Sequence, residues 1–234
     1  MDSPSEKTAL TIQYLRSLPL LEGISQDSLE IIARGSRIKL ATKGAFLFLK
    51  GDTADAVYLV REGAILIHIE SLDGRALVIN EISAGDCCGE LGVLTGQPHS
   101  ANAEAIVDSE VLVIPGSIFN DLVEKESSLA LQMLKVTALR LQASSRREEA
   151  LAFYDARERL ARLLLYLDKL TKEKGYITLS QEELAQRTGL TRQTVAAVLG
   201  DWRRNGWLLT GRGHIVILNR GALHLLVENL ETPL

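Results

Sequence analysis

Residues 191–204, near the C-terminal end of the chain, carry polar side chains suited to reading a pattern of hydrogen-bonding groups. Arg192 can donate two parallel hydrogen bonds, and the neighbouring Gln193 can donate and accept at the same time. In the major groove of DNA, guanine matches the first pattern and adenine the second. Residues at the start of a recognition helix reach the base edges, so this placement predicts sequence-specific contacts to double-stranded DNA.

Other polar residues around Arg192 are expected to share this contact. Contacts to phosphates position a protein on the duplex but carry no sequence information. Ala197 offers at most an apolar contact to the thymine methyl group. The predicted DNA-binding residues are Ser180, Thr191, Arg192, Gln193, Thr194, Ala196, Ala197, Arg203, Arg204 and Arg212, with Thr188 as a further phosphate contact.

Two short helices joined by a tight turn must position these side chains. Ser180 and Glu183 have the spacing of a capping box, which predicts a helix over 181–188. Gly189 allows a tight turn, and Thr191 can cap a second helix that continues to about Asn205. After it, two β-type runs flank a Gly-Arg-Gly turn and predict a hairpin, and residues 221–229 predict a last helix. The alternative is a generic helix pair with a solvated polar face.

Residues 127–155 contain neither Pro nor Gly and predict one long helix with two apolar stripes. A helix with two stripes needs two partners, so we expect one face on the N-terminal part of the chain and the other on a second copy. The alternative is a core helix of a single domain. The predicted dimer interface is Val136, Leu139, Ala143, Arg146, Ala150 and Phe153, and a second face holds Leu131, Leu134, Leu141 and Leu151.

The long helix is expected to end in a hinge at Phe153, Tyr154 and Asp155. Asp155 is a good N-cap for a further helix that would end near Lys174-Gly175. Between residues 37 and 113, short β-branched runs alternate with turn signals such as Asp73-Gly74, which predicts an antiparallel barrel or roll. Short helices are expected over 8–18, 26–34 and 117–125, and a short strand over 177–179. The predicted fold class is α+β, with an antiparallel barrel or roll, a long helix and a helix-turn-helix that is followed by a hairpin.

Charge is divided unevenly along the 234 residues, whose net charge is −4. Residues 1–155 hold 14 Lys and Arg against 22 Asp and Glu, a net −8, whereas residues 156–234 hold 12 against 8, a net +4. This asymmetry indicates an acidic module joined to one that binds a polyanion.

The sequence predicts a cytoplasmic protein without a membrane segment. It has two adjacent cysteines, no apolar leader and no uncharged apolar run near 18 residues. The sequence shows no catalytic triad, Walker loop or pair of catalytic carboxylates, so it does not indicate an enzyme.

Three further segments carry a resemblance to a known family. GDTADAVYLVREGAI resembles the start of a cyclic-nucleotide-binding β-roll, GELGVLTGQPHSANAEA its phosphate-binding cassette, and RLQASSRREEALAFYD a dimerisation helix and hinge. With the winged helix-turn-helix, the chain resembles the CRP/FNR family of bacterial transcription regulators over about residues 10–220. The resemblance implies an effector domain with a jelly-roll-like β-roll at 1–126, a dimerisation helix and hinge at 127–155, and a winged helix-turn-helix DNA-binding domain at 156–234. It also implies a homodimer on a pseudo-palindromic DNA site, contact with RNA polymerase and a small-molecule effector.

The resemblance also assigns roles in the cassette. Gly89 and Ser100 would hold a phosphate, and Glu90 would accept a hydrogen bond from a ribose hydroxyl. His99 stands where the family has an Arg that neutralises the phosphate, and His is mostly neutral at pH 7. Ser144 and Ser145 match two hydroxyl positions that contact adenine. The candidate effector-binding residues are Gly89, Glu90, Leu91, His99, Ser100, Ala101, Ser144 and Ser145.

The identity of the effector stays open at this point, between cAMP or another cyclic nucleotide, a different small molecule and no effector. His99 weakens the case for cAMP. Cys87, Cys88 and His99 also suggest haem or thiol-redox sensing, because thiolate and imidazole can bind haem iron, whereas an iron–sulfur cluster would need about four cysteines. His68, His214 and His224 lack neighbours at metal spacing and are expected to be structural. A different class of function is a sensing module that docks a partner protein through its helix-turn-helix.

Overall fold

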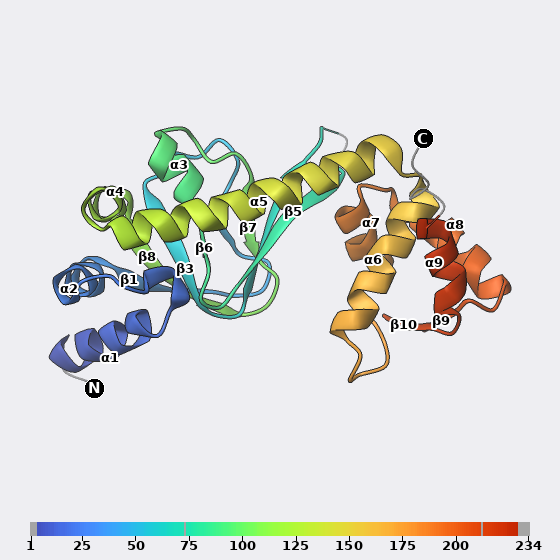
Figure 1. Cartoon of the computed structure of the whole chain (residues 1–234), viewed down its shortest axis with the longest axis horizontal. Coiled ribbons are helices and arrows are strands. Elements are labelled where there is room, and N and C mark those ends of the chain that lie inside the picture. The colour runs from blue at the N-terminus through green and yellow to red at the C-terminus, as the bar shows by residue number, and fades with distance from the viewer. Residues whose placement is uncertain (1–3, 73, 212, 229–234) are drawn as a thin grey trace. The chain divides into compact units, whose positions relative to one another are not determined.

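A computed structural model of the chain describes residues 4–72, 74–211 and 213–228. The chain divides into two compact units, which are described separately below. The first unit holds the chain up to Ile69 together with Ile79–Gln142, and the second holds Glu70–Val78 together with the chain from Ala143 onward. The long helix α5, Ser127–Phe153, contributes to both units (Figure 1). Its predicted extent is confirmed to within two residues.

Two four-stranded sheets form a β-roll in the first unit. Their strand orders are β1-β8-β3-β6 and β2-β7-β4-β5, and the paired strands run antiparallel. A buried cluster joins both sheets, with Val60 and Val111 from the first and Ile65 and Ala103 from the second. The strands span β1 Arg37–Ala41, β2 Phe46–Phe48, β3 Ala56–Glu62, β4 Ala64–Glu70, β5 Ala76–Ser83, β6 Cys87–Cys88, β7 Asn102–Ala105 and β8 Ser109–Pro115.

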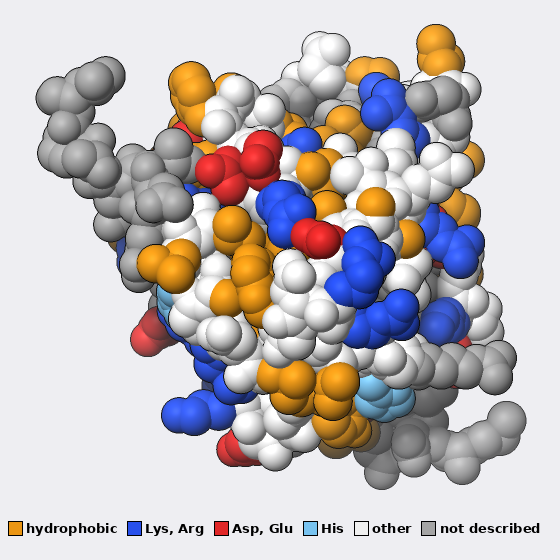
Figure 2. All heavy atoms as spheres, turned by 90° about the vertical axis from the view of Figure 1, so that its right-hand side faces the viewer, with side chains coloured by type: hydrophobic (Ala, Val, Ile, Leu, Met, Phe, Trp, Pro, Cys, Tyr) orange, Lys and Arg blue, Asp and Glu red, His pale blue; other side chains and the backbone are white. Residues whose placement is uncertain are grey.

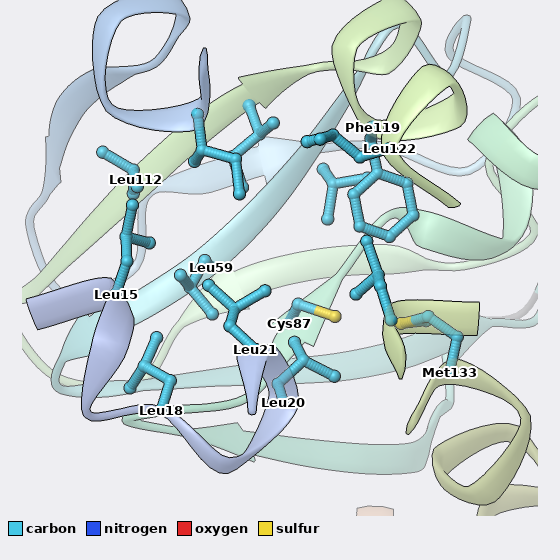
Figure 3. Close-up of a cluster of buried hydrophobic side chains, with 14 of the residues drawn as sticks. Leu15, Leu18, Leu20, Leu21, Leu59, Cys87, Leu112, Phe119, Leu122 and Met133 are labelled. Carbon is cyan, nitrogen blue, oxygen red and sulfur yellow. The ribbon is translucent and has the colours of Figure 1, made fainter. Parts of the chain in front are cut away.

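Helices bury a second apolar cluster against the first sheet. Leu59 of β3 and Leu112 of β8 meet Leu15, Phe119 and Met133, which come from three different helices. Figure 3 shows these side chains gathered into one core. Removing such a large surface from water is the main force that holds helices to a sheet. The helices are α1 Pro4–Arg16, the 3-10 helix η1 Pro19–Leu21, α2 Gln26–Gly35, α3 Glu90–Thr95 and α4 Gly116–Lys125.

One face of α5 packs on this core, and its other apolar residues remain exposed. Leu129 and Met133 are buried in the core, and Val136 packs against it partly buried. The spacing of four and then three residues keeps all three on one side of the helix. Val136 therefore lies on the roll-facing stripe, and not on a separate seam as the sequence suggested. The exposed large apolar residues are Leu131, Leu134, Leu139, Leu141, Leu151 and Phe153.

The second unit combines helices with a two-stranded wing. Its core includes Leu160, Leu184, Val195 and Leu199, which surround the fully buried Trp202. The antiparallel strands β9 and β10 form the predicted hairpin. The elements are α6 Ala156–Leu170, α7 Gln181–Thr188, α8 Arg192–Arg204, β9 Leu208–Gly211, β10 His214–Ile217 and α9 Arg220–Glu228.

The predicted α+β fold is confirmed, with small differences at element ends. Helix α6 ends at Leu170, earlier than expected, where its C-cap Thr171 leaves the helical conformation with φ of −103° and ψ of 20°. Residues 177–179 form no strand, and only Ile177 makes an isolated bridge to Ile215. Asp73 of the expected turn lies outside the described residues. Among the helices that the structure describes, none is long and apolar enough to cross a bilayer.

Candidate nucleic-acid interface and ligand cassette

The helix-turn-helix forms where the sequence predicts it, with both helices capped. The Ser180 hydroxyl accepts from the Glu183 backbone N–H, and the Glu183 carboxylate accepts from the Ser180 backbone N–H. Gly189 follows α7 with φ of 65°, in the left-handed region that favours glycine. The Thr191 hydroxyl then accepts from the Thr194 backbone N–H and starts α8. These caps place Arg192 in the first turn of α8.

The first turn of α8 presents its polar side chains to solvent. Arg192, Gln193 and Ala197 are exposed, whereas Val195 and Leu199 on the opposite side are buried. Thr194 and Ala196 are half-buried, and Arg203 and Arg204 near the end of the helix are exposed. Figure 2 shows Lys and Arg side chains on one face of the molecule, among hydrophobic, acidic and uncharged polar groups. The buried side of α8 thus fixes the helix while its outer side stays accessible.

One of the predicted phosphate contacts is buried and others are exposed. Thr188 is buried, and its hydroxyl donates to the Leu184 carbonyl at 2.7 Å, so its expected phosphate contact is wrong. The sequence does not reveal the partner of this hydroxyl, because a Thr late in a helix can donate to a carbonyl of the helix itself. Ser180 remains exposed while it caps α7, and Arg204 lies 3.6 Å from Asp201. Arg212 lies outside the described residues.

A groove of about 310 Å³ lies beside the start of α8. Its lining brings Arg192 together with Gln181 at the start of α7 and with Thr210 and His214 of the wing. Gln181, Thr210 and His214 are not among the predicted interface residues. The sequence shows that these residues are polar and that Thr210 and His214 flank Gly211 and Gly213. It does not show that the wing lies beside the start of α8, which only the fold reveals.

The cassette in the first unit is built around a buried carboxylate. Glu90, the first residue of α3, is only 2% exposed. Arg140 of α5 donates through Nη1 to Glu90 Oε1, and its Nη2 lies 3.1 Å from Asp86 Oδ1 and 2.7 Å from the Cys87 carbonyl oxygen. Burial raises the pKa of Glu90, and the Arg140 charge opposes that shift. Glu90 Oε2 is buried and makes no hydrogen bond to any described residue.

Arg140 was not among the predicted site residues, although the helix pattern contains a signal for it. Leu129, Met133, Val136 and Arg140 follow one another at steps of four, three and four, so all four lie on the roll-facing side. Burial alone would lower the pKa of Arg140, but the charges of Glu90 and Asp86 raise it. The guanidinium therefore stays charged and joins α5 to the cassette within the first unit.

His99 occupies the position in the cassette where the family resemblance implies an Arg. Its ring is 5% exposed and stacks on Phe48, with centroids 3.6 Å apart and an interplanar angle of 10°. Burial lowers the pKa of His99, although Asp52 and Asp55 oppose this shift. The imidazole is therefore neutral at pH 7. The structure thus fills this position with an uncharged aromatic pair.

The remaining candidate effector residues have mixed environments. Leu91 and Ser100 are exposed and Ala101 is buried, while Gly89 adopts φ of 87° just before α3. Ser144 and Ser145 belong to the second compact unit. Ser144 is half-buried and its hydroxyl donates to Glu148 Oε1 at 3.3 Å. The contact of these serines with an effector stays a prediction.

The two cysteines do not provide a ligand set for haem iron. Cys87 packs in the core beneath the helices, whereas Cys88 packs in the core between the sheets, so the two thiols lie on opposite faces of β6. Burial raises the pKa of both, so both stay protonated thiols, which are poor metal ligands. Within the described ranges, no group of three His, Cys, Asp or Glu residues could hold a metal ion.

The predicted hinge contains a second capping box. The Asp155 carboxylate accepts from the Arg157 and Glu158 backbone N–H groups, and the Glu158 carboxylate accepts from the Asp155 N–H. Tyr154 donates to Glu149 Oε1 at 2.9 Å, and the Arg162 guanidinium lies over its ring.

The predicted dimer interface on α5 is mostly exposed apart from Val136. Its other members are Leu139, Ala143, Arg146 and Phe153, which are exposed, and Ala150, which is half-buried.

Comparisons with known proteins agree with this architecture. Residues 38–126 match the family model of the cyclic nucleotide-binding domain, and residues 158–226 match that of the Crp-like helix-turn-helix domain. The cAMP-activated global transcriptional regulator Vfr of Pseudomonas aeruginosa is 30% identical over 186 residues, which cover 76% of this chain and 86% of that protein. A CRP-like cAMP-activated global transcriptional regulator of Mycobacterium tuberculosis is 25% identical over 211 residues, covering 87% and 94%.

A solved structure supports the same relationship. A transcriptional regulator of the CRP/FNR family from Thermus thermophilus is 27% identical, with a TM-score of 0.66 over 82% of this chain and 98% of that one. The roll, the long helix and the winged helix-turn-helix thus occur here in the order found in those regulators. The chain belongs to the CRP/FNR family of bacterial transcription regulators.

Proposed function

We propose that the protein is a homodimeric, sequence-specific DNA-binding regulator whose β-roll senses a small molecule and repositions the helix-turn-helix through α5. The observation that carries the DNA-binding part is the exposure of Arg192 and Gln193 in the capped first turn of α8, beside the groove that reaches the wing. Relatives with the same helix-turn-helix are transcription regulators.

Base reading follows from the chemistry of this turn. Arg192 can give guanine two hydrogen bonds, and Gln193 can pair with adenine N6 and N7. Ala197 offers only a methyl group, which favours thymine at its position. Around these contacts, Ser180, Arg203 and Arg204 are exposed and can bind phosphates. We therefore expect a half-site in which guanine and adenine are read by neighbouring side chains.

The exposed leucines of α5 support a dimer. Leu131, Leu134 and Leu141 are between 52% and 67% exposed and recur with the spacing of a coiled-coil seam. A second copy of the same helix would bury them, so the seam is proposed to run through these residues rather than through Val136. A twofold-symmetric dimer reads two half-sites about one helical turn apart. Such a regulator is expected to contact RNA polymerase at its promoter.

Effector control would act through the stripe that joins α5 to the roll. Arg140 connects α5 to Glu90 and Asp86 of the cassette, so a ligand that changes these contacts would change the position of α5. The hinge at Tyr154 and Asp155 would then favour one placement of the DNA-binding domains. This is a population shift, and it requires the ligand to bind one state better than the other.

The experiment that tests this function is a selection from random DNA duplexes with the purified full-length protein. Enriched duplexes are then measured by fluorescence anisotropy at several KCl concentrations. We expect a pseudo-palindrome with half-site centres about 10 bp apart and binding that weakens steeply with salt. Enrichment of no sequence, together with salt-independent binding, would refute the DNA-reading role and favour a protein-docking one.

A further inference from the structure

The His99 ring fills the space at the first turn of α3. A Cβ atom placed on Gly89 would lie 3.4 Å from His99 Cε1, and one placed on Gly92 would lie 3.6 Å from His99 Nδ1. Both distances are ordinary van der Waals contacts. The ring therefore lies directly against the two glycines of the cassette.

Both the ring and the backbone of His99 are fixed in place. The ring lies flat on Phe48, with 3.6 Å between centroids, which leaves no room for a group between them. The His99 backbone N–H donates to the Asp52 carbonyl at 2.9 Å, and the His99 carbonyl accepts from the Gly51 N–H at 2.8 Å. Moving the ring aside would expose the Phe48 face and break the stack, so the closed position is the stable one.

The charges that face this position oppose an anion. Asp52 and Asp55 are the ionised groups that act on the His99 ring. Arg140, whose guanidinium reaches the cassette from α5, is already engaged by Glu90, Asp86 and the Cys87 carbonyl. A phosphate entering beside His99 would lose water and meet the carboxylates of Asp52 and Asp55, which is costly.

We propose that the His99–Phe48 stack closes the cassette to the phosphate of a cyclic nucleotide, and that His99 sets this specificity. The inference rests on the proposed effector-sensing role of the roll and narrows its effector to small molecules without a phosphate group. It goes beyond the loss of a charged Arg, because it assigns the exclusion to the volume of the ring. An exclusion by volume is relieved by any smaller side chain, whereas a missing charge is not.

The test is a titration of the full-length protein with cAMP by isothermal calorimetry at pH 7.5. The proteins are the wild type, His99→Ala and His99→Arg. If the ring excludes the phosphate, His99→Ala binds cAMP at least about tenfold more tightly than the wild type. His99→Arg restores a positive charge but keeps a side chain larger than the imidazole, so exclusion by volume predicts that it binds cAMP no more tightly than His99→Ala does. Tighter binding by His99→Arg alone, with His99→Ala equal to the wild type, would assign the weak binding to the missing charge. Equal cAMP affinity of the wild type and His99→Ala would overturn the proposal.

A second variant and a control test whether the change in cAMP affinity comes from the stack and not from one substitution. Phe48→Leu keeps an apolar side chain but removes the flat partner, and it is expected to raise cAMP affinity in the same direction. His68→Ala is the matched control, because His68 is also 5% exposed and stacks on Phe46, but on β4, and it should bind cAMP as the wild type does. Anisotropy with a selected duplex, run on the same samples, tests DNA binding separately, so failure of either proposal can be told from failure of the other.

Discussion

Arg140 donates from the middle of α5 to the carboxylate of Glu90, which is 2% exposed at the start of α3. A buried carboxylate needs a partner, because desolvation of an unpaired charge is costly. Arg140 supplies that partner and reaches Asp86 and the Cys87 carbonyl with its other nitrogen. The long helix is thus held to the roll by a charged contact at the end of its apolar stripe.

Replacing Arg140 with Ala should destabilise the first unit. The change leaves Glu90 buried without its counter-ion, and breaking such a pair costs about 3 kcal/mol, at the low end of the usual range because Arg140 is itself partly exposed. Urea unfolding of the full-length protein measures this change. Lys135→Ala, which removes an exposed charge from the same helix, should change the free energy of unfolding by less than about 0.5 kcal/mol. Equal stability of Arg140→Ala and Lys135→Ala would contradict the role of the pair.

Much of the fold follows from the sequence because its signals are local. The caps at Ser180 and Asp155, the left-handed Gly189 and the uninterrupted helix from Ser127 were all predictable from residue types a few positions apart. The Glu90–Arg140 pair was not, because its members lie 50 residues apart and each was consistent with an exposed position. Apolar periodicity indicated that α5 has two sides, but it could not decide on which side Val136 lies.

The stability of the protein should depend on His99 at mildly acidic pH. Burial lowers the pKa of His99, so the folded state binds a proton less readily than the unfolded state does. Above the usual His pKa near 6.5, His99 is neutral in both states and does not change the free energy of unfolding. The free energy of unfolding then decreases as the pH falls from 6.5 through the lowered pKa of the folded state. His99→Asn should remove this part of the pH dependence. Urea midpoints of both proteins between pH 8 and 5 test this, and identical curves would count against a buried, neutral His99.

The proposed seam on α5 can be tested at Leu134, which is 65% exposed in the single chain. Leu134→Lys removes an apolar contact from each of the two copies. At about 1.5–3 kcal/mol for each buried Leu, the dimer should weaken by a hundredfold or more. Analytical ultracentrifugation measures the change. Leu170→Lys is the control, because Leu170 is equally exposed but lies at the end of α6. A dimer unaffected by Leu134→Lys would place the interface elsewhere.

Ser180 is a cap in the structure and a predicted phosphate contact, and one variant separates the two roles. Ser180→Ala removes the hydroxyl that accepts from Glu183, which should lower the free energy of unfolding by about 1 kcal/mol. If the hydroxyl also binds a phosphate, DNA affinity falls equally for all sequences. Asp155→Ala provides the comparison, since it loses a similar cap in α6. A loss of stability with unchanged DNA binding would restrict Ser180 to the capping role.

The central claim is that Arg192 reads a base, and its most direct test compares affinities on different duplexes. Anisotropy gives the Kd of the wild type and Arg192→Ala for the selected duplex and for one with the predicted guanine replaced in each half-site. Lys172→Ala, an exposed charge in the turn after α6, is the control for charge loss. We predict that Arg192→Ala costs about 1–3 kcal/mol on the selected duplex and little on the substituted one. Equal weakening on both duplexes would show that Arg192 binds a phosphate and would contradict the account.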